Sequence, residues 1–443
     1  MKKNLLGLFL ILFAVVNLMA DDKKVFPYNY TTEKLDNGLK VILIPMDSPG
    51  LVAYYSIVRT GSRDEWEPGK SGFAHFFEHM MFRGTERFPG AVYDSLVTSI
   101  GADANAYTSN DLTVYHINFA SEDLDKVMDI ESDRFQNLSY DEREFQTESG
   151  AVYGEYRKGR TSPFSVAIEK MQDMAYDVHT YKHTTIGFES DIKNMPNQYD
   201  YSKSFYQRYY RPENVVLMIV GDIDPAKTMS MVKKYYSSWK PGYVSPKIEQ
   251  EPAQNEAHSA EVSYEGRTLP LLIEGYKCDA FDVSNTNYLA SIFLADLAFG
   301  ETSDLYKKLF LNEQKVEMIA ANAGMSRDPG LFYIYSMVKT PDDIDYVRQE
   351  IFKTLDFFKT NKVDEKKLND LKSNMKYSFL MGLETPDDVA GGLARFIALT
   401  GDITVVDSFY NNLMKITPED VMNAAKLYFE ENHRNEIVLK GAK

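Results

Sequence analysis

The sequence predicts an α+β protein built from two equivalent halves, and two observations lead to this fold class. The chain has 443 residues, whereas a single hydrophobic core stops growing at roughly 250–300 residues, so two domains are expected. In addition, segment 195–221 is similar to segment 417–441, about half a chain later. Each has a helical pattern, a short break and an apolar strand, and chance similarity between two common units is the alternative. The aligned pairs are Pro196 and Pro418, Tyr206 and Tyr428, and Val216 and Val438.

The first twenty residues have the three parts of a secretory signal peptide. Lys2 and Lys3 precede an apolar run over 5–16, and Ala20 precedes the charged run 21–24. We therefore expect cleavage after Ala20 and an exported, most simply periplasmic, protein. A membrane anchor is the alternative, but the apolar run is shorter than the ~20 residues of a spanning helix, so no stable membrane insertion is expected.

Composition and charge restrict the partners and sites. The chain has 49 basic and 65 acidic residues, a net charge of −16, which would become −18 if Lys2 and Lys3 were removed. Such a protein repels nucleic acid and anionic membranes and tolerates or attracts cationic peptides, although plain solubility explains the charge equally well. Cys278 is the only cysteine, so internal disulfides and cysteine-based zinc sites are excluded, and we expect a small core residue.

The elements of the first half follow from hydrophobic spacing and turn residues. Asn37-Gly38 between apolar runs predicts a hairpin, and Ser121 is a candidate N-cap for a helix over 121–135. Strand-like patterns cover 51–65, 105–120 and 214–224. Helical patterns cover 72–82, 91–101, 141–158, 163–177, 199–210 and 225–239.

The pattern lapses after this first series of elements. Three prolines and many polar residues between 241 and 260 predict a linker. The expected organisation is a signal peptide at 1–20, a first domain at 21–240, the linker at 241–260 and a second domain at 261–443.

The stretch "HFFEH" carries the candidate chemistry, in His75, Glu78 and His79. Residues four apart share one face of a helix, so the two imidazoles can bind one ion. Two neutral imidazoles suit zinc, and the neighbouring carboxylate can accept a proton from metal-bound water, whose pKa zinc lowers to roughly 7. The alternative is an ordinary core helix with two histidines, and both interpretations can hold at once.

A catalytic zinc site needs a third protein ligand, and Glu148 and Glu155 are candidates because they lie two helical turns apart on one face. Glu155 lies 76 positions after His79. His179 and His183 are also four residues apart, but no acidic residue separates them, so a second metal site there is the weaker alternative.

HxxEH followed by a glutamate 76 residues later resembles the pitrilysin/insulinase-type zinc peptidases, which include mitochondrial processing peptidase. The stretches "HMMFRGTERFP" (79–89), "NAYTSNDLTVYHI" (105–117) and "RPENVVLMIVGDID" (211–224) are also similar to that family. The resemblance implies two homologous α/β domains, each a mostly antiparallel sheet with packed helices, enclosing a chamber. It also implies a zinc-dependent endopeptidase acting on peptides or unfolded protein segments.

The resemblance implies a role for each matching residue. His75, His79 and Glu155 match the ligands of one zinc ion per chain, in a catalytic domain over 21–240. Glu78 matches the general base that activates a zinc-bound water, and Glu148 matches an acid that orients the site.

Asn105 and Ala106 match the strand that binds the peptide substrate by β-augmentation. The segment 302–318 departs from the family, because Phe310 and Glu317 stand where an Arg and a Tyr are expected to reach the zinc site. Neither side chain can hold a polarised carbonyl by hydrogen bonding.

The second domain is expected to lack metal ligands. The departure at Phe310 and Glu317 predicts a partner of the same family that supplies the Arg/Tyr pair, or a homodimer. The alternative function is a non-catalytic binding or assembly subunit of a heterodimeric peptidase.

Overall fold

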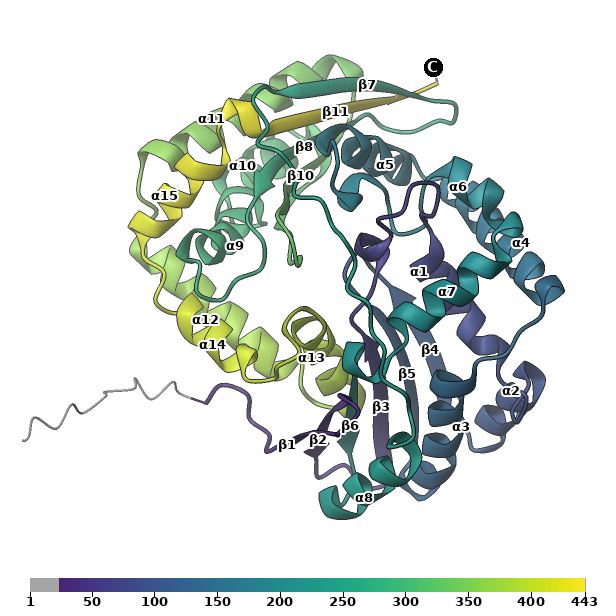
Figure 1. Cartoon of the computed structure of the whole chain (residues 1–443). Coiled ribbons are helices and arrows are strands. Elements are labelled where there is room, and N and C mark those ends of the chain that lie inside the picture. Colours follow the sequence, from purple (N-terminus) through teal and green to yellow (C-terminus); the bar gives the residue numbers. More distant parts are fainter. Residues whose placement is uncertain (1–23, 443) are drawn as a thin grey trace, which may run out of the picture.

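The chain folds into two mixed sheets with helices packed around them, arranged as a ring in projection (Figure 1). The computed structural model describes residues 24–442, so the predicted signal peptide at 1–20 lies outside the described residues. No single helix within residues 24–442 is long and apolar enough to cross a membrane.

The first sheet has six strands, and only the pair β2–β6 is parallel. In spatial order the strands are β1 (Thr31–Lys34), β2 (Lys40–Pro45), β6 (Val215–Gly221), β3 (Leu51–Val58), β5 (Thr113–Ala120) and β4 (Asp103–Thr108). The hairpin predicted at Asn37-Gly38 joins β1 to β2, and Gly38 has the positive φ of 99° that such a turn requires.

The second sheet has five strands, and again only one pair, β7–β11, is parallel. In spatial order these are β7 (His258–Tyr264), β11 (Arg434–Gly441), β8 (Leu271–Cys278), β10 (Gly330–Val338) and β9 (Val316–Ala323). β6 and β11, the strands of the sequence repeat, lie at equivalent positions, between a parallel and an antiparallel neighbour. The predicted fold class, two similar halves with mostly antiparallel sheets, is therefore confirmed.

Helices occupy most of the remaining chain in both halves. In the first half they are α1 (Phe73–Met80), α2 (Gly90–Ser99), α3 (Leu124–Asn137), α4 (Glu142–Gly159), α5 (Pro163–Ala175), α6 (Glu189–Asn194), α7 (Tyr199–Tyr209) and α8 (Pro225–Tyr236). In the second half they are α9 (Thr286–Phe299), α10 (Asp304–Tyr306), α11 (Ile344–Thr360), α12 (Glu365–Met381), α13 (Pro386–Thr400), α14 (Val405–Leu413) and α15 (Pro418–Tyr428).

Three local predictions differ from the structure. The strand predicted at 51–65 ends at Val58, and a 3₁₀ turn follows over 62–64. The extended segment 105–120 is a hairpin, β4 and β5, with a turn over 109–112. Ser121 is not the N-cap of α3, because a 3₁₀ turn over 121–123 precedes the helix and Asp123 occupies the cap position. The Ser121 hydroxyl instead donates to Asp222 at 3.1 Å, which ties the end of β5 to the end of β6.

The central strands contribute alternate side chains to two different cores. Along β6, Val215, Leu217 and Ile219 pack with helices of the first half, whereas 216, 218 and 220 pack in a core shared with the second half. Successive side chains of a strand point to opposite faces, so a strand buried on both faces appears as a continuous apolar run.

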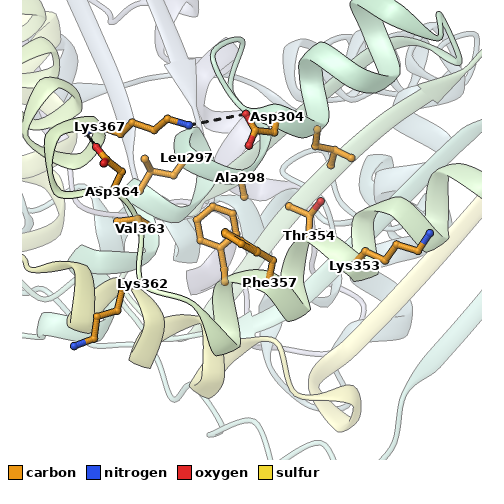
Figure 2. Close-up of a pocket in the computed structure, with 12 residues that line it drawn as sticks. Leu297, Ala298, Asp304, Lys353, Thr354, Phe357, Lys362, Val363, Asp364 and Lys367 are labelled. Atoms are coloured by element: carbon orange, nitrogen blue, oxygen red, sulfur yellow. Dashed lines mark hydrogen bonds and ion pairs between the residues drawn. The ribbon is translucent and has the colours of Figure 1, made fainter.

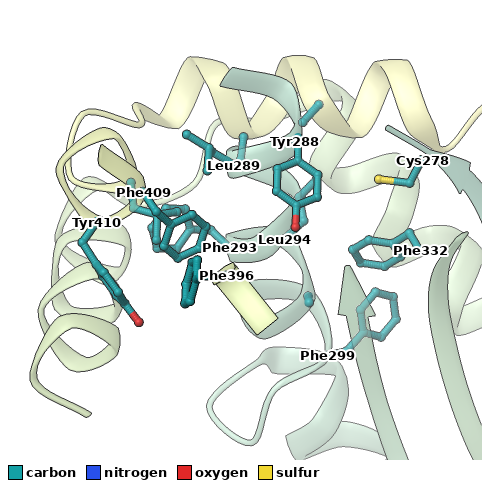
Figure 3. Packing of buried hydrophobic residues seen from close by; sticks show 14 of the residues in the cluster. Cys278, Tyr288, Leu289, Phe293, Leu294, Phe299, Phe332, Phe396, Phe409 and Tyr410 are labelled. Carbon is teal, nitrogen blue, oxygen red and sulfur yellow. The ribbon is translucent and has the colours of Figure 1, made fainter. Parts of the chain in front are cut away.

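One helix of each half packs against the sheet of the other half. Helix α13 packs against β3 and β6 of the first sheet, and α5 packs against β7, β8 and β11 of the second (Figure 1). Figure 3 shows part of the shared core, with Phe396 of α13 beside Phe293 of α9 and Phe409 of α14. Cys278 lies in the same core as a buried free thiol, as predicted. Separating the halves would expose these apolar faces to water, so the packing of α5 and α13 across the interface holds the two halves together.

The segment between the halves has no helix or strand over 237–257, and β7 begins inside the predicted linker. Glu251 nevertheless anchors this segment, because its carboxylate accepts the backbone N–H groups of Asp177, Val178 and His179 at 2.8–3.1 Å.

A polar contact also joins the halves. Asp328, in the loop between β9 and β10, accepts hydrogen bonds from Arg63 and from His179 Nε2, the latter at 3.0 Å. Burial alone would raise the pKa of Asp328, but these two partners outweigh it and hold the pKa well below its usual range.

We expect Asp328→Asn to lower the free energy of unfolding at pH 7 by about 1–3 kcal/mol, the usual cost of losing a charged hydrogen bond. A carboxylate whose folded pKa is depressed stabilises above its unfolded pKa of about 3.9, and this contribution disappears as the pH falls through the folded value. The difference between variant and wild type in denaturant unfolding should therefore shrink below about pH 4. Asp356→Asn, at a 70% exposed side chain, is the control; an equal loss in both variants would contradict the prediction.

Candidate metal centre

Helix α1 has one apolar face and one face that carries the candidate ligands. Phe76 packs edge-on against Phe145 of α4, and Phe77 stacks on Phe205 of α7, with ring centroids 5.0 and 5.3 Å apart. These contacts fix the helix between α4 and α7 and leave His75 and His79 on its other face. The helix is thus both a core element and a carrier of two imidazoles.

The structure brings His75, His79 and Glu155 together. Glu155 Oε2 lies 3.5 Å from His75 Nε2 and 3.5 Å from His79 Nε2, and the three donor atoms lie within 4.8 Å of one another. Tetrahedral zinc with bonds of 2.0–2.2 Å requires donor atoms about 3.4 Å apart. Both distances from Glu155 are close to this value, so the three side chains would suit a zinc ion.

Glu148 holds His79 in the orientation that a ligand needs. Its Oε1 lies 2.9 Å from His79 Nδ1, and its Oε2 accepts a 2.8 Å bond from Arg83 Nε. The contact at Nδ1 leaves His79 Nε2 facing Glu155. Burial would raise the pKa of Glu148, but the bonds from His79 and Arg83 outweigh it and lower the pKa, while the bond to Glu148 raises the pKa of His79.

His75, unlike His79, has no carboxylate at its Nδ1 within residues 24–442. Its Nδ1 is buried and has no hydrogen-bond partner among the residues that the structure describes. Burial, and to a smaller extent the nearby His79, lowers the pKa of His75 to about 4. The imidazole is therefore neutral at pH 7, the form that binds a metal.

Glu78 lies beside the cluster and faces strand β4. Its Oε2 accepts a 2.6 Å hydrogen bond from the Thr108 hydroxyl. Burial raises the pKa of Glu78, and the bond from Thr108 opposes that rise. Sequence reasoning missed Thr108, although it lies in the family-like stretch at 105–117.

Asn105 and Ala106 lie on β4, the edge strand of the first sheet, which contacts Glu78 through Thr108. The Ala106 N–H donates to the side-chain oxygen of Asn105 at 2.8 Å. This edge has no neighbouring strand among residues 24–442, so it presents backbone groups that an extended peptide can pair with.

The other candidate residues lie outside the cluster. His179 binds Asp328, whereas His183 Nε2 lies 3.8 Å from Glu65, so these two histidines have different partners. Within residues 24–442, His75, His79 and Glu155 are the only group of three that could hold a metal ion.

Phe310 and Glu317 have structural surroundings in the second half. Phe310 stacks on Tyr306 at 4.8 Å and packs against the shared core. Glu317 lies 3.6 Å from Lys339. The second half thus offers no Arg/Tyr pair at these positions.

A pocket of about 630 Å³ lies in the second half and is separate from the cluster (Figure 2). Phe357 and Leu297 line its apolar part, and Lys353, Lys362 and Lys367 lie around it. None of its lining residues belongs to α1 or α4, so it does not extend the metal centre.

Comparisons with known proteins relate this fold and cluster to a family of metallopeptidases. The family model "Insulinase (Peptidase family M16)" matches residues 48–188, and "Peptidase M16 inactive domain" matches residues 198–375. The chain belongs to the insulinase (M16) peptidase family. The region matched by the second model contributes none of the three clustered residues.

Relatives from Helicobacter pylori and Escherichia coli are similar over most of this chain. The zinc protease PqqE of H. pylori is 28% identical over 99% of this chain and 98% of its own. The crystal structure of a protease from H. pylori has a TM-score of 0.87 at 28% identity, covering 93% of this chain and 99% of that one. The periplasmic protease PqqL of E. coli shares the fold, with a TM-score of 0.75 at 21% identity over 93% of this chain and 48% of that one.

We expect Glu148→Gln to weaken zinc binding about 10–100-fold, because it replaces the carboxylate that orients His79. The affinity is measured by competition with a coloured chelator. Glu142→Gln, at an exposed glutamate on the same helix, should leave the affinity unchanged. Equal affinities of Glu148→Gln and wild type would contradict the orienting role.

Proposed function

We propose that the chain is an exported zinc endopeptidase that hydrolyses peptides or unfolded protein segments. The observation that carries this proposal is the placement of His75, His79 and Glu155 at ligand spacing, with Glu78 beside them and an open strand edge next to Glu78. Export is supported by the signal-like sequence at 1–20.

The residues divide the work as follows. A bound zinc ion would polarise the scissile carbonyl and lower the pKa of water. Glu78 accepts the proton of the attacking water and returns it to the leaving amine, while Thr108 keeps its carboxylate directed at the site. The edge of β4 at Asn105 and Ala106 holds the peptide as an added strand.

The proposal includes a partner of the same family that supplies an Arg/Tyr pair. Phe310 packs in an apolar environment and Glu317 pairs with Lys339, so neither stabilises charge on a reacting carbonyl. PqqL, at about twice the length of this chain, is an example of this fold joined to a second segment of similar size. A homodimer is the alternative, although a second copy would again present Phe310 and Glu317.

The lack of an Arg/Tyr pair at positions 310 and 317 favours a second candidate function, a binding or assembly subunit without activity of its own. Such a subunit has no need for His75, Glu78, His79 and Glu155 together, so stoichiometric zinc would favour the enzyme.

The test combines elemental analysis with peptide cleavage. The mature chain, residues 21–443, is assayed alone on a peptide library and again with proteins that co-purify from the native envelope fraction. One zinc per chain with cleavage only in the presence of a partner is expected. Full activity of the chain alone would refute the need for a partner. Absence of both zinc and cleavage in every preparation would refute the proposed peptidase function.

A further inference from the structure

The start of α1 determines where one metal ligand lies. The helix has eight residues, from Phe73 to Met80, so His75 belongs to its first turn and His79 to the next. Such a short helix is unstable by itself, and its end frays unless the free N–H groups find partners. The position of His75 therefore depends on how this first turn is capped.

The residue at the cap position cannot cap the helix. Gly72 has no side chain, and its φ of 93° is in the left-handed region. A Cβ at this position would lie 2.6 Å from the Ile186 carbonyl oxygen, so the backbone is packed too closely for another residue. The usual Ser, Thr, Asp or Asn cap is excluded here.

Glu65 caps the helix from seven residues upstream. Its Oε2 accepts the Gly72 N–H at 2.7 Å, and its Oε1 accepts the Ala74 N–H at 2.6 Å. The side chain is buried, with 4% of the residue exposed. Burial raises the pKa of Glu65, and the two backbone N–H bonds oppose that rise. A carboxylate at the N-terminus of a helix satisfies free donors and interacts favourably with the helix dipole.

The turn that carries Glu65 is itself fixed. The Arg63 N–H donates to the Asn110 carbonyl at 2.8 Å, and the Arg63 side chain binds Asp328 of the second half. The carboxylate therefore approaches α1 from a rigid support that is anchored to both halves.

We propose that Glu65 is a positioning residue for the metal centre, which holds His75 in register with His79 and Glu155 by capping the first turn of α1. It contacts neither the ligands nor the substrate site. The consequence for catalysis rests on the function proposed above, whereas the capping itself is a property of the fold. A buried carboxylate that only stabilised the protein would lower the unfolding midpoint without a specific effect on α1.

The test compares Glu65→Gln with Glu274→Gln. Glu274 is also buried, on β8 of the second sheet, but its carboxylate oxygens have no hydrogen-bond partner in the described part of the chain, so Glu274→Gln controls for the loss of a buried carboxylate away from α1. Glu65→Gln retains the size of the side chain but places an amide N–H₂ against a backbone donor. Three quantities are measured in the full chain: amide hydrogen exchange over 72–77 without metal, Zn²⁺ affinity by chelator competition, and the visible spectrum with Co²⁺.

We expect Glu65→Gln to increase exchange over 72–77 at least tenfold, to weaken Zn²⁺ binding about 10–100-fold and to alter the Co²⁺ spectrum. Glu274→Gln should leave all three quantities at their wild-type values. Unchanged exchange and affinity in Glu65→Gln, or equal changes in both variants, would overturn the proposal.

Two further results remain decisive. If Glu65→Gln does not fold, Glu65→Asp, which keeps the charge but shortens the reach, should show the same local exchange and weaker Zn²⁺ binding; wild-type values would overturn the proposal. If the wild type binds no Zn²⁺, the proposed function fails, and exchange over 72–77 still decides the role of Glu65.

Discussion

Replacing Glu78 with Gln is expected to reduce peptide cleavage by roughly 10²–10⁴-fold, the usual contribution of a general base, while the zinc content stays that of the wild type. The carboxylate is not among the three clustered ligands, so its loss leaves them in place. Gln can still accept the hydrogen bond from Thr108, which preserves the local geometry. The substitution thus removes the proton acceptor and little else.

The cleavage rate is measured with the mature chain and the proteins that co-purify with it, and zinc by elemental analysis of the same sample. Glu86→Gln, at an exposed glutamate shortly after the motif, is the control and should retain full activity. Because burial raises the pKa of Glu78, the acid limb of the wild-type pH profile should lie above the usual range of a glutamate. Full activity of Glu78→Gln would rule out the proposed role.

Replacing His75 with Ala is expected to remove zinc from the purified protein and to abolish cleavage. Three ligands share the binding free energy, and apparent values for protein zinc sites start near 10 kcal/mol, so one ligand contributes about 3 kcal/mol, a factor of roughly 100 in affinity. His75 Nδ1 has no partner within the described part of the chain, so the substitution breaks no hydrogen-bond network.

The measurement is zinc stoichiometry after dialysis against a weak chelator, combined with cleavage. His116→Ala is the matched control, since His116 is a partly buried histidine on β5 that stacks on Tyr55 and lies outside the cluster. It should retain zinc. Stoichiometric zinc in His75→Ala would exclude His75 as a ligand.

Local spacing predicted the parts of the site that lie close together in the sequence. His75, Glu78 and His79 share one helix, and helical geometry alone places two imidazoles on one face. Glu155 is 76 residues from His79, and its assignment needed the resemblance to a family. The packing of α4 against α1 then brings its carboxylate within 3.5 Å of both histidines.

Other features depend on contacts between segments that the sequence does not connect. The helical pattern at 163–177 predicted α5, but it does not say which sheet the helix covers. In the structure α5 packs on the second sheet and α13 on the first. Ser121 was predicted to cap α3 from its position alone, but its hydroxyl binds Asp222 instead.

The sequence by itself determined the helix that carries His75, Glu78 and His79 from local spacing, and the two-half fold class from the chain length and the internal repeat. The departure at Phe310 and Glu317 needed the resemblance to a family as well. Only the tertiary structure decided how the helix is held. Three contacts join groups that the folding of the chain brings together: the capping of α1 by Glu65, the hydrogen bond from Thr108 to Glu78, and the packing of α5 and α13 on the sheet of the opposite half. Such contacts are set by the packing of whole elements, for which local patterns carry no signal.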